Sequence, residues 1–329
     1  MKALVYTGTQ TSSIEDVDAP EPLAGQALIK LSLCGICGSD MHAWHGQDDR
    51  RIPPLILGHE SVGFAVTGTL AGSRVALNPL MTCNECDCCQ NGIEHLCAKR
   101  ELIGMRVPGA FAEQIAIDEK NLVVLPDHLS FEEAALAEPL ACCVHAVKLA
   151  IKLSGGRKDP DILILGGGAI GLLSAFVFEA YGYANIAVAE TNAVRRGMLK
   201  QFEVITAVNP IKSEGLTARG PDMIIDAVGS SQTRRYSSQI IRPGGVIVHI
   251  GLQDNDSGLD TRRITLQEVT FQGTYCYQTT DFKESIDLLG SGKISGLGWV
   301  EFRDLADGPK AFFDIHNGSA PAKIILKTQ

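Results

Sequence analysis

The first 125 residues contain short apolar runs separated by glycine and proline, without the 3.6-residue repeat of a long helix. Residues 27–34, 74–80 and 121–126 are examples of these runs. Short apolar runs with this punctuation are typical of strands. The pattern therefore predicts a compact β-rich domain at the start of the chain.

The pattern changes at Ser130, which stands three residues before Glu133 in the spacing of a helix capping box. Residues 140–153 carry apolar side chains on most faces, which predicts a buried connecting helix. The glycine-containing stretch 154–160 then breaks this pattern, so we expect a domain junction near it.

Strand and helix patterns alternate through residues 161–293. Six short apolar runs predict a mostly parallel, doubly wound sheet; they are residues 161–166, 186–190, 204–208, 223–227, 245–251 and 268–275. The connection between the third and fourth runs leaves room for little more than one helical turn. After a helix at 281–292, the last stretch has a strand, helix, strand pattern that we expect to fold back onto the first domain.

The predicted class is therefore α/β with two domains, since 329 residues exceed the size at which one hydrophobic core usually stops growing. Residues 1–150 and 294–329 are assigned to the β-rich domain, and residues 151–293 to the doubly wound domain. The net charge of −9 argues against a nucleic-acid or anionic-membrane partner. We expect a small-molecule substrate and, without a signal-like start or long apolar run, a cytoplasmic location.

A glycine motif follows the first strand of the doubly wound domain. Gly166, Gly168 and Gly171 form G-x-G-x-x-G at the start of a helix, and Glu190 ends the next strand. Such glycines allow a tight turn, close approach of a pyrophosphate and close helix packing, and the acid binds the adenosine ribose. Glu190 favours NAD over NADP, although Arg195 and Arg196 keep NADP open as an alternative.

Five cysteines lie within residues 83–97. Four of them have the spacing C-x2-C-x2-C-x7-C, which suits a closed tetrahedral zinc site; they are Cys83, Cys86, Cys89 and Cys97. A disulfide set is disfavoured in a reducing compartment, and a redox switch would need fewer, more isolated thiols. The lobe therefore predicts a structural zinc ion.

A second metal site is expected because a site with four sulfur ligands has no open position for chemistry. Cys37, His59 and Glu60 offer a sulfur, an imidazole and a carboxylate, and Glu138 adds a carboxylate within an apolar stretch. Catalytic zinc takes three protein ligands and leaves one position open.

Together these motifs resemble the zinc-dependent medium-chain dehydrogenase/reductase family of alcohol dehydrogenases, nearest its sorbitol, polyol and threonine dehydrogenase branch. The resemblance spans nearly the whole chain and implies a GroES-like β domain with a Rossmann domain. It implies catalytic zinc on Cys37, His59 and either Glu138, which we prefer, or Glu60. It also implies a proton relay through Ser39 and His42. The implied cofactor contacts are Gly166, Gly168, Ala169, Ile170, Gly171, Glu190, Arg195, Ile250, Gly251, Leu252, Tyr275, Cys276 and Tyr277.

The family resemblance implies hydride transfer from a secondary alcohol of a polyol, a sugar alcohol or a related hydroxy compound to NAD, with zinc as the Lewis acid. Threonine and phosphorylated polyols are alternative substrates, and a nucleotide-binding scaffold without catalysis is the alternative from another class. Cys276 stands where polyol relatives often carry arginine. By analogy with the family, a homodimer or homotetramer is expected.

Overall fold

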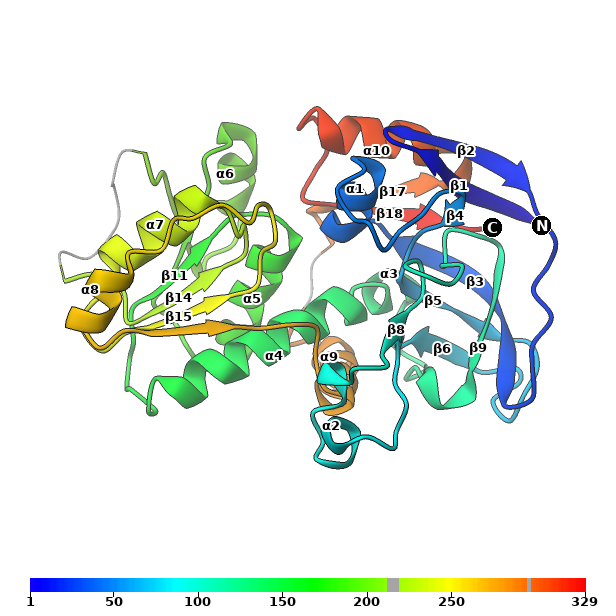
Figure 1. The fold of residues 1–329 in the computed structure, drawn as a ribbon, viewed down its shortest axis with the longest axis horizontal. Coiled ribbons are helices and arrows are strands. Elements are labelled where there is room, and N and C mark those ends of the chain that lie inside the picture. Colours follow the sequence, from blue (N-terminus) through cyan, green and yellow to red (C-terminus); the bar gives the residue numbers. More distant parts are fainter. Residues whose placement is uncertain (212–218, 295–296) are drawn as a thin grey trace. The chain divides into compact units, whose positions relative to one another are not determined.

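The chain divides after residues 139 and 277 into two units, seen as ribbons in Figure 1. The computed structural model describes residues 1–211, 219–294 and 297–329. One unit comprises Met1–Pro139 and Gln278–Gln329, and the other comprises Leu140–Tyr277.

These limits differ from the predicted ones, 150/151 and 293/294, for a physical reason. Helix α4 (Ala137–Leu153) runs through both the observed limit after residue 139 and the predicted limit after residue 150, without a break in its hydrophobic pattern. Helix α9 (Thr279–Gly290) belongs to the first unit, where the Ser285 hydroxyl donates a hydrogen bond to the Ala137 carbonyl at 2.8 Å. The polar break after α4 therefore lies inside the second unit.

The first unit is built mainly of strands, which confirms its predicted β-rich character. One sheet has the order β2-β1-β4, and the largest has the order β10-β6-β5-β3-β18-β17 with β9 also paired to β3. The strands are β1 (Lys2–Gly8), β2 (Thr11–Asp16), β3 (Gln26–Gly35), β4 (Leu55–Ile56), β5 (Glu60–Ala65), β6 (Arg74–Leu77), β7 (Leu80–Met81), β8 (Glu101–Leu102), β9 (Gln114–Asp118), β10 (Leu122–Val124), β17 (Val300–Asp304) and β18 (Lys323–Lys327).

The last strand returns to the first domain as predicted. Strand β18 pairs antiparallel with β3, with Ile325 opposite Gly35 and Leu326 opposite Cys34. Between the two closing strands runs α10 (Gly308–His316). Phe312 of α10 and the side chains of Trp44 and Phe111 are almost fully buried in the core of this unit. Trp44 and Phe111 are therefore core residues.

The described part of the first unit also contains the short α-helices α1 (Gly38–Trp44), α2 (Asp87–Gln90) and α3 (Phe131–Ala134). The capping box at the start of α3 is confirmed, because the Ser130 hydroxyl accepts a hydrogen bond from the Glu133 amide at 3.2 Å. The sequence pattern did not predict α1, since seven residues are too few to show a helical repeat.

The second unit contains a parallel sheet of six strands in the order β13-β12-β11-β14-β15-β16. This confirms the predicted doubly wound fold, whose order 3-2-1-4-5-6 places a ligand at the carboxyl ends of the strands. Figure 1 shows the helices around this sheet. The elements are β11 (Ile162–Leu165), α5 (Ala169–Ala180), β12 (Ile186–Ala189), α6 (Ala193–Leu199), β13 (Ile205–Val208), β14 (Met223–Asp226), α7 (Ser231–Ile240), β15 (Val246–His249), α8 (Thr261–Leu266) and β16 (Thr270–Gly273).

The predicted single helical turn between β13 and β14 falls on residues 212–218, which lie outside the described residues. Among the residues that are described, no helix has the length and apolar character needed to cross a membrane.

Candidate active site and metal centres

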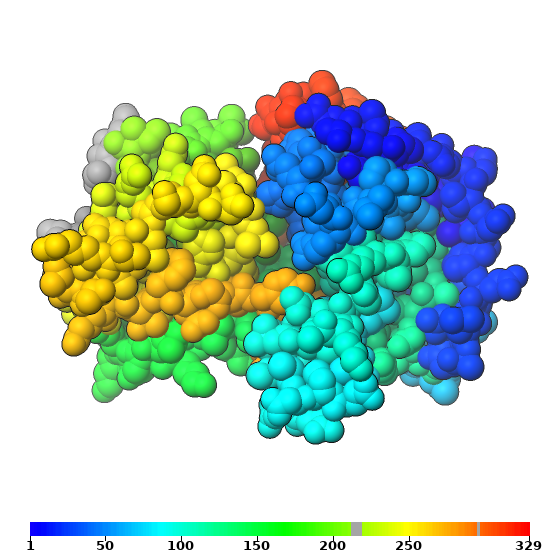
Figure 2. Space-filling model, in the orientation of Figure 1, coloured from blue at the N-terminus to red at the C-terminus, as the bar shows by residue number. Residues whose placement is uncertain are grey.

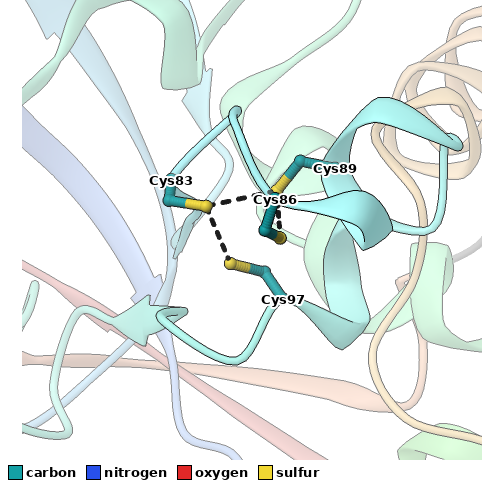
Figure 3. A group of neighbouring side chains, drawn as sticks. All are labelled: Cys83, Cys86, Cys89 and Cys97. Atoms are coloured by element: carbon teal, nitrogen blue, oxygen red, sulfur yellow. Dashed lines mark hydrogen bonds between the residues drawn. The ribbon is translucent and has the colours of Figure 1, made fainter.

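The cysteine lobe brings its four predicted ligands together. The sulfur atoms of Cys83, Cys86, Cys89 and Cys97 all lie within 4.8 Å of one another, and Figure 3 shows them pointing toward a common centre. The Sγ atoms of Cys83 and Cys97 are 3.5 Å apart, and those of Cys83 and Cys89 are 3.8 Å apart. Ligands at about 2.3 Å from a tetrahedral zinc ion lie about 3.8 Å from one another. The set therefore matches the size of a zinc site.

The same distances exclude disulfides in this lobe, since a bonded pair of sulfur atoms lies about 2.05 Å apart. The four sulfur atoms are therefore thiols available to a metal ion. Backbone amides of Glu85 and Cys86 lower the pKa of Cys83 to about 6. Burial and the neighbouring Cys86 and Cys97 thiols raise the pKa of Cys89 to about 12. A cation among the four sulfur atoms would stabilise their thiolate forms.

The lobe is also held to the start of α9 within the first unit. The Glu94 carboxylate accepts a hydrogen bond from the Thr279 amide at 2.7 Å, and the Gln278 side chain donates to the Gly92 carbonyl. In Figure 2 the lobe, coloured cyan, projects from the surface of this unit. A cation at the four sulfurs would therefore stiffen a projecting loop that is anchored at one side.

A second cluster joins Cys37, His59 and Glu60, whose ligand atoms also lie within 4.8 Å of one another. Cys37 directly precedes α1, and His59 and Glu60 stand where β5 begins. His59 and Glu60 are buried, and Cys37 is half-buried. Sulfur, nitrogen and carboxylate oxygen form a common ligand set for catalytic zinc, so the residues present fit this metal.

Asp40 belongs to the same cluster, although the sequence analysis did not select it. Its carboxylate is fully buried, accepts a hydrogen bond from the Cys37 amide at 3.0 Å, and lies 3.4 Å from Nδ1 of His59. Nδ1 therefore faces Asp40, which leaves Nε2 for a metal. The only signal for Asp40 in the sequence was an acid in the first turn after Cys37.

The charges of this cluster favour a cation. Burial acts against ionisation of Asp40, but the charges of His59 and Arg51 outweigh it and lower the pKa of Asp40. Burial also acts to lower the pKa of His59, but the charges of Asp40 and Cys37 outweigh it and raise that pKa well above its usual value. The Asp40 carboxylate is thus an anion beside a buried imidazole, and it would favour a positive charge on that ring or on a metal ion bound to it.

Glu60 has a second partner in Lys323 of β18. The Lys323 ammonium group donates a hydrogen bond to Oε2 of Glu60 and another to the Ile36 carbonyl at 2.9 Å, and both side chains are buried. A carboxylate has two oxygens, so this ion pair leaves Oε1 for another ligand. The sequence analysis did not find Lys323, because nothing local distinguishes it.

Ser39 lies beside the cluster, with its hydroxyl oxygen 3.4 Å from Nε2 of His59. His42, on the same helix, has Nδ1 3.4 Å from Oε1 of Gln47. Glu138 is buried near the start of α4, but it is not part of the three-residue cluster. The structure therefore brings Cys37, Ser39, His59 and Glu60 together more directly than Glu138 or His42.

The second unit contains a cavity of about 740 Å³ at the carboxyl ends of its strands. Gly166, Gly168, Glu190 and Arg195, four of the predicted cofactor contacts, line it. Gly166 has φ +97°, which only glycine adopts readily, and a Cβ on Gly171 would lie 1.8 Å from the Gly166 carbonyl oxygen. The amides at the start of α5 have no side-chain cap, so they remain available to a pyrophosphate.

Glu190 is held in place by several donors. It accepts hydrogen bonds from the amides of Gly167 at 2.9 Å and Asn192 at 2.7 Å, and from Nε of Arg195 at 3.1 Å. Burial raises the pKa of Glu190, but these amides and Arg195 outweigh it, so the net pKa is lowered. Glu190 is therefore an anion at neutral pH, which disfavours a 2′-phosphate beside it.

The other predicted cofactor residues lie outside this cavity lining. Ala169 and Ile170 begin α5, residues 250–252 follow β15, and residues 275–277 follow β16. Their contact with a cofactor stays a prediction. The cavity also contains polar residues that the sequence analysis missed because they come from loops and from α7: Ser230, Gln232, Thr233, Tyr236 and Gln253.

Comparisons with known proteins agree with this geometry. Residues 23–127 match the alcohol dehydrogenase GroES-like domain, and residues 169–291 match the zinc-binding dehydrogenase model. The chain is 30% identical to "Probable D-xylulose reductase A" of Neosartorya fischeri, over 99% of this chain and 97% of the relative. It is 33% identical to D-arabitol-phosphate dehydrogenase of Enterococcus avium, over 85% of this chain and 83% of the relative.

Among solved structures, galactitol-1-phosphate dehydrogenase from Escherichia coli is similar, with a TM-score of 0.87 and 25% identity over 99% of this chain and 100% of that chain. The two family models match residues in both units, and the first match includes Cys37, His59, Glu60 and the four cysteines of the lobe. The chain therefore belongs to the zinc-dependent medium-chain dehydrogenase/reductase family, in its polyol dehydrogenase branch, and is a zinc-binding, nicotinamide-dependent oxidoreductase.

Proposed function

We propose that this chain oxidises a secondary hydroxyl group of a neutral polyol with NAD and reduces the matching ketone in the reverse direction. The observation that carries the proposal is the cluster of Cys37, His59 and Glu60 beside the Ser39 hydroxyl. Three ligands can hold a metal ion that activates the alcohol, and the adjacent hydroxyl group can receive the alcohol's proton.

Cys37 and His59 would hold the catalytic zinc ion together with one carboxylate. Bound zinc would supply Lewis-acid polarisation of the substrate oxygen. We favour Glu60 as the third ligand because it lies in the cluster, whereas the family resemblance alone favoured Glu138. Zinc content of Glu60→Gln and Glu138→Gln variants distinguishes the two, since only loss of the direct ligand should empty the site. Cys83, Cys86, Cys89 and Cys97 would hold the structural zinc ion.

Ser39 would receive the proton of the substrate hydroxyl, and His42 would take it toward solvent. Ser39 Oγ can both accept and donate a hydrogen bond, so it can exchange one proton for another. Asp40 would keep the imidazole of His59 in one orientation. These residues move or fix protons, while the hydride goes from the carbinol carbon to the nicotinamide ring.

NAD is the cofactor we propose. The pyrophosphate would lie at the start of α5, where Gly168 has no side chain near its Cβ position. Glu190 would accept hydrogen bonds from the adenosine ribose, in the manner of other Rossmann domains. Arg195 is already paired with Glu190, which reduces its capacity to bind a 2′-phosphate.

A phosphorylated polyol is the second candidate substrate, because D-arabitol-phosphate dehydrogenase is among the relatives. The test is an assay of NAD and NADP reduction with xylitol, sorbitol, arabitol phosphate, galactitol 1-phosphate, threonine and 2-butanol. We expect the highest kcat/KM for a neutral polyol with NAD. A clear preference for a phosphorylated polyol would change the substrate class. NADH binding without turnover of any compound would support a non-catalytic scaffold and refute the proposal.

We also propose a cytoplasmic location and self-association into a homodimer or homotetramer. A chain with ten cysteines, four of them gathered as a metal-ligand set, is consistent with a reducing compartment. Light scattering of the purified chain tests the oligomeric state.

A further inference from the structure

Arg51 is a buried cation beside the proposed proton relay. Only 2% of its surface is exposed. Its Nε donates to the Gly104 carbonyl at 2.8 Å, and Nη1 donates to Oδ2 of Asp48 at 2.5 Å. Its Nη2 lies 3.3 Å from the hydroxyl oxygen of Ser39 and donates to it. A guanidinium group is costly to bury unless its N–H groups are hydrogen-bonded. Here the guanidinium donates to three acceptors in different directions, which fixes its position.

The contact with Ser39 limits what that hydroxyl can do. A serine hydroxyl has one proton to donate and two lone pairs to accept with. Arg51 uses one lone pair, which leaves one lone pair and one proton. Since Nδ1 of His59 faces Asp40, Nε2 is left for the metal and would then have no lone pair for the serine proton. The free proton and the free lone pair of Ser39 are therefore available to other groups.

We propose that Arg51 is a positioning residue of the proton relay, which it controls through Ser39. This inference rests on the proposed function. As the substrate hydroxyl transfers its proton to the free lone pair of Ser39, the original serine proton leaves toward His42, and the hydride goes to NAD. The nearby positive charge opposes a second proton on Ser39, so receipt and release of protons are coupled. Without the Nη2 donor, the serine hydroxyl would rotate among several orientations.

The surroundings of Arg51 support a fixed role. Asp48 also accepts hydrogen bonds from the Nε of Arg50 at 2.8 Å, and its side chain is largely buried. Arg50 is exposed and pairs with the same Asp48 carboxylate, so it serves as a matched control. Lysine at position 51 would keep the charge but could not reach three acceptors with a planar fork.

The test compares Arg51→Met, Arg51→Lys and the control Arg50→Met. For each variant we would measure zinc content, NADH affinity, kcat, KM and the solvent deuterium isotope effect on kcat. For Arg51→Met we expect kcat to fall on the order of 100-fold, with KM, two zinc ions per chain and NADH affinity nearly unchanged. The solvent isotope effect should increase, because proton transfer becomes slower than hydride transfer. Arg51→Lys should lose less activity, and Arg50→Met should behave like the wild type.

A double variant, Ser39→Ala with Arg51→Met, separates the relay role from a structural one. If Arg51 acts through Ser39, the double variant is no slower than Ser39→Ala alone. Additive losses, or wild-type kcat and isotope effect in Arg51→Met, would overturn the proposal. If Arg51→Met does not fold, the isotope effect and double variant are measured with Arg51→Lys. A wild-type chain that oxidises no alcohol overturns the proposed function together with this inference, whereas an active wild type isolates the role of Arg51.

Discussion

Lys323 and Glu60 form a buried ion pair between residues 263 positions apart in the chain. Burial would lower the pKa of Lys323, but the charges of Glu60 and Cys37 outweigh it, so the net pKa is raised. Lys323 is therefore charged at neutral pH, and its contact with Glu60 joins the last strand to the metal cluster. Removing one partner would leave the other charge buried without compensation.

This pair leads to a prediction about stability. In chelator-treated protein, we expect Lys323→Met to lower the free energy of unfolding by about 3–5 kcal/mol, because the Glu60 carboxylate loses its partner. The double variant with Glu60→Gln should be destabilised by less than the sum of the two single variants. Urea unfolding measures these differences. Lys327→Met, at an exposed position of the same strand, is the control, and strictly additive effects would contradict the pairing.

The cysteine lobe leads to a prediction about metal content. We expect Cys83→Ser to lose one of two zinc ions per chain and to unfold at a lower temperature, because the four-sulfur site loses a ligand. Cys88→Ser should retain both ions, since Cys88 is not part of the sulfur cluster. Mass spectrometry of the metal content checks both variants. Equal zinc content in the two variants would be evidence against a structural site at these four cysteines.

Glu190 leads to a prediction about cofactor choice. We expect Glu190→Gln to lower kcat/KM for NAD about 10-fold, since hydrogen bonds to a charged group contribute about 1.5–3 kcal/mol. The ratio of NAD to NADP efficiency should also fall, because the repulsion of a 2′-phosphate is removed. Steady-state kinetics with both cofactors measures the ratio. Glu203→Gln changes an exposed acid in the same unit and should leave the ratio unaltered.

Asp48 leads to a prediction about pH. Burial acts to raise its pKa, but hydrogen bonds and charges from Arg50 and Arg51 lower it to about 2. Because the folded-state pKa lies below the unfolded value of about 3.9, the stabilisation is present above pH 4 and is lost as the pH falls toward 2. We expect Asp48→Asn to cost about 1 kcal/mol at pH 6 and almost nothing at pH 2. Denaturant unfolding between pH 2 and 6 checks this, and a pH-independent difference would be the contrary result.

Local spacing was sufficient to predict part of the site. The four cysteines and the glycine motif lie within short segments, so their spacing along the chain largely determines their spacing in space. Asp40, Arg51 and Lys323 could not be predicted, because their importance comes from contacts between segments that only the tertiary fold brings together. The limits of the two compact units differ from the predicted domain limits for a similar reason, since α4 runs through residues 139 and 150 without any change in pattern.

The first unit is built from two segments of the chain, with the whole second unit between them in the sequence, and this affects how the protein folds. Lys323 donates to the carbonyl of Ile36, a partner 287 residues earlier, and all of the second unit is synthesised between them. The second unit is continuous in sequence and can therefore reach its native state while the first remains incomplete. Closure of the sheet by β18 pairs segments that are far apart in the sequence, so we expect it to be a late step. Nascent chains should thus acquire nucleotide-binding ability before they acquire a finished metal cluster.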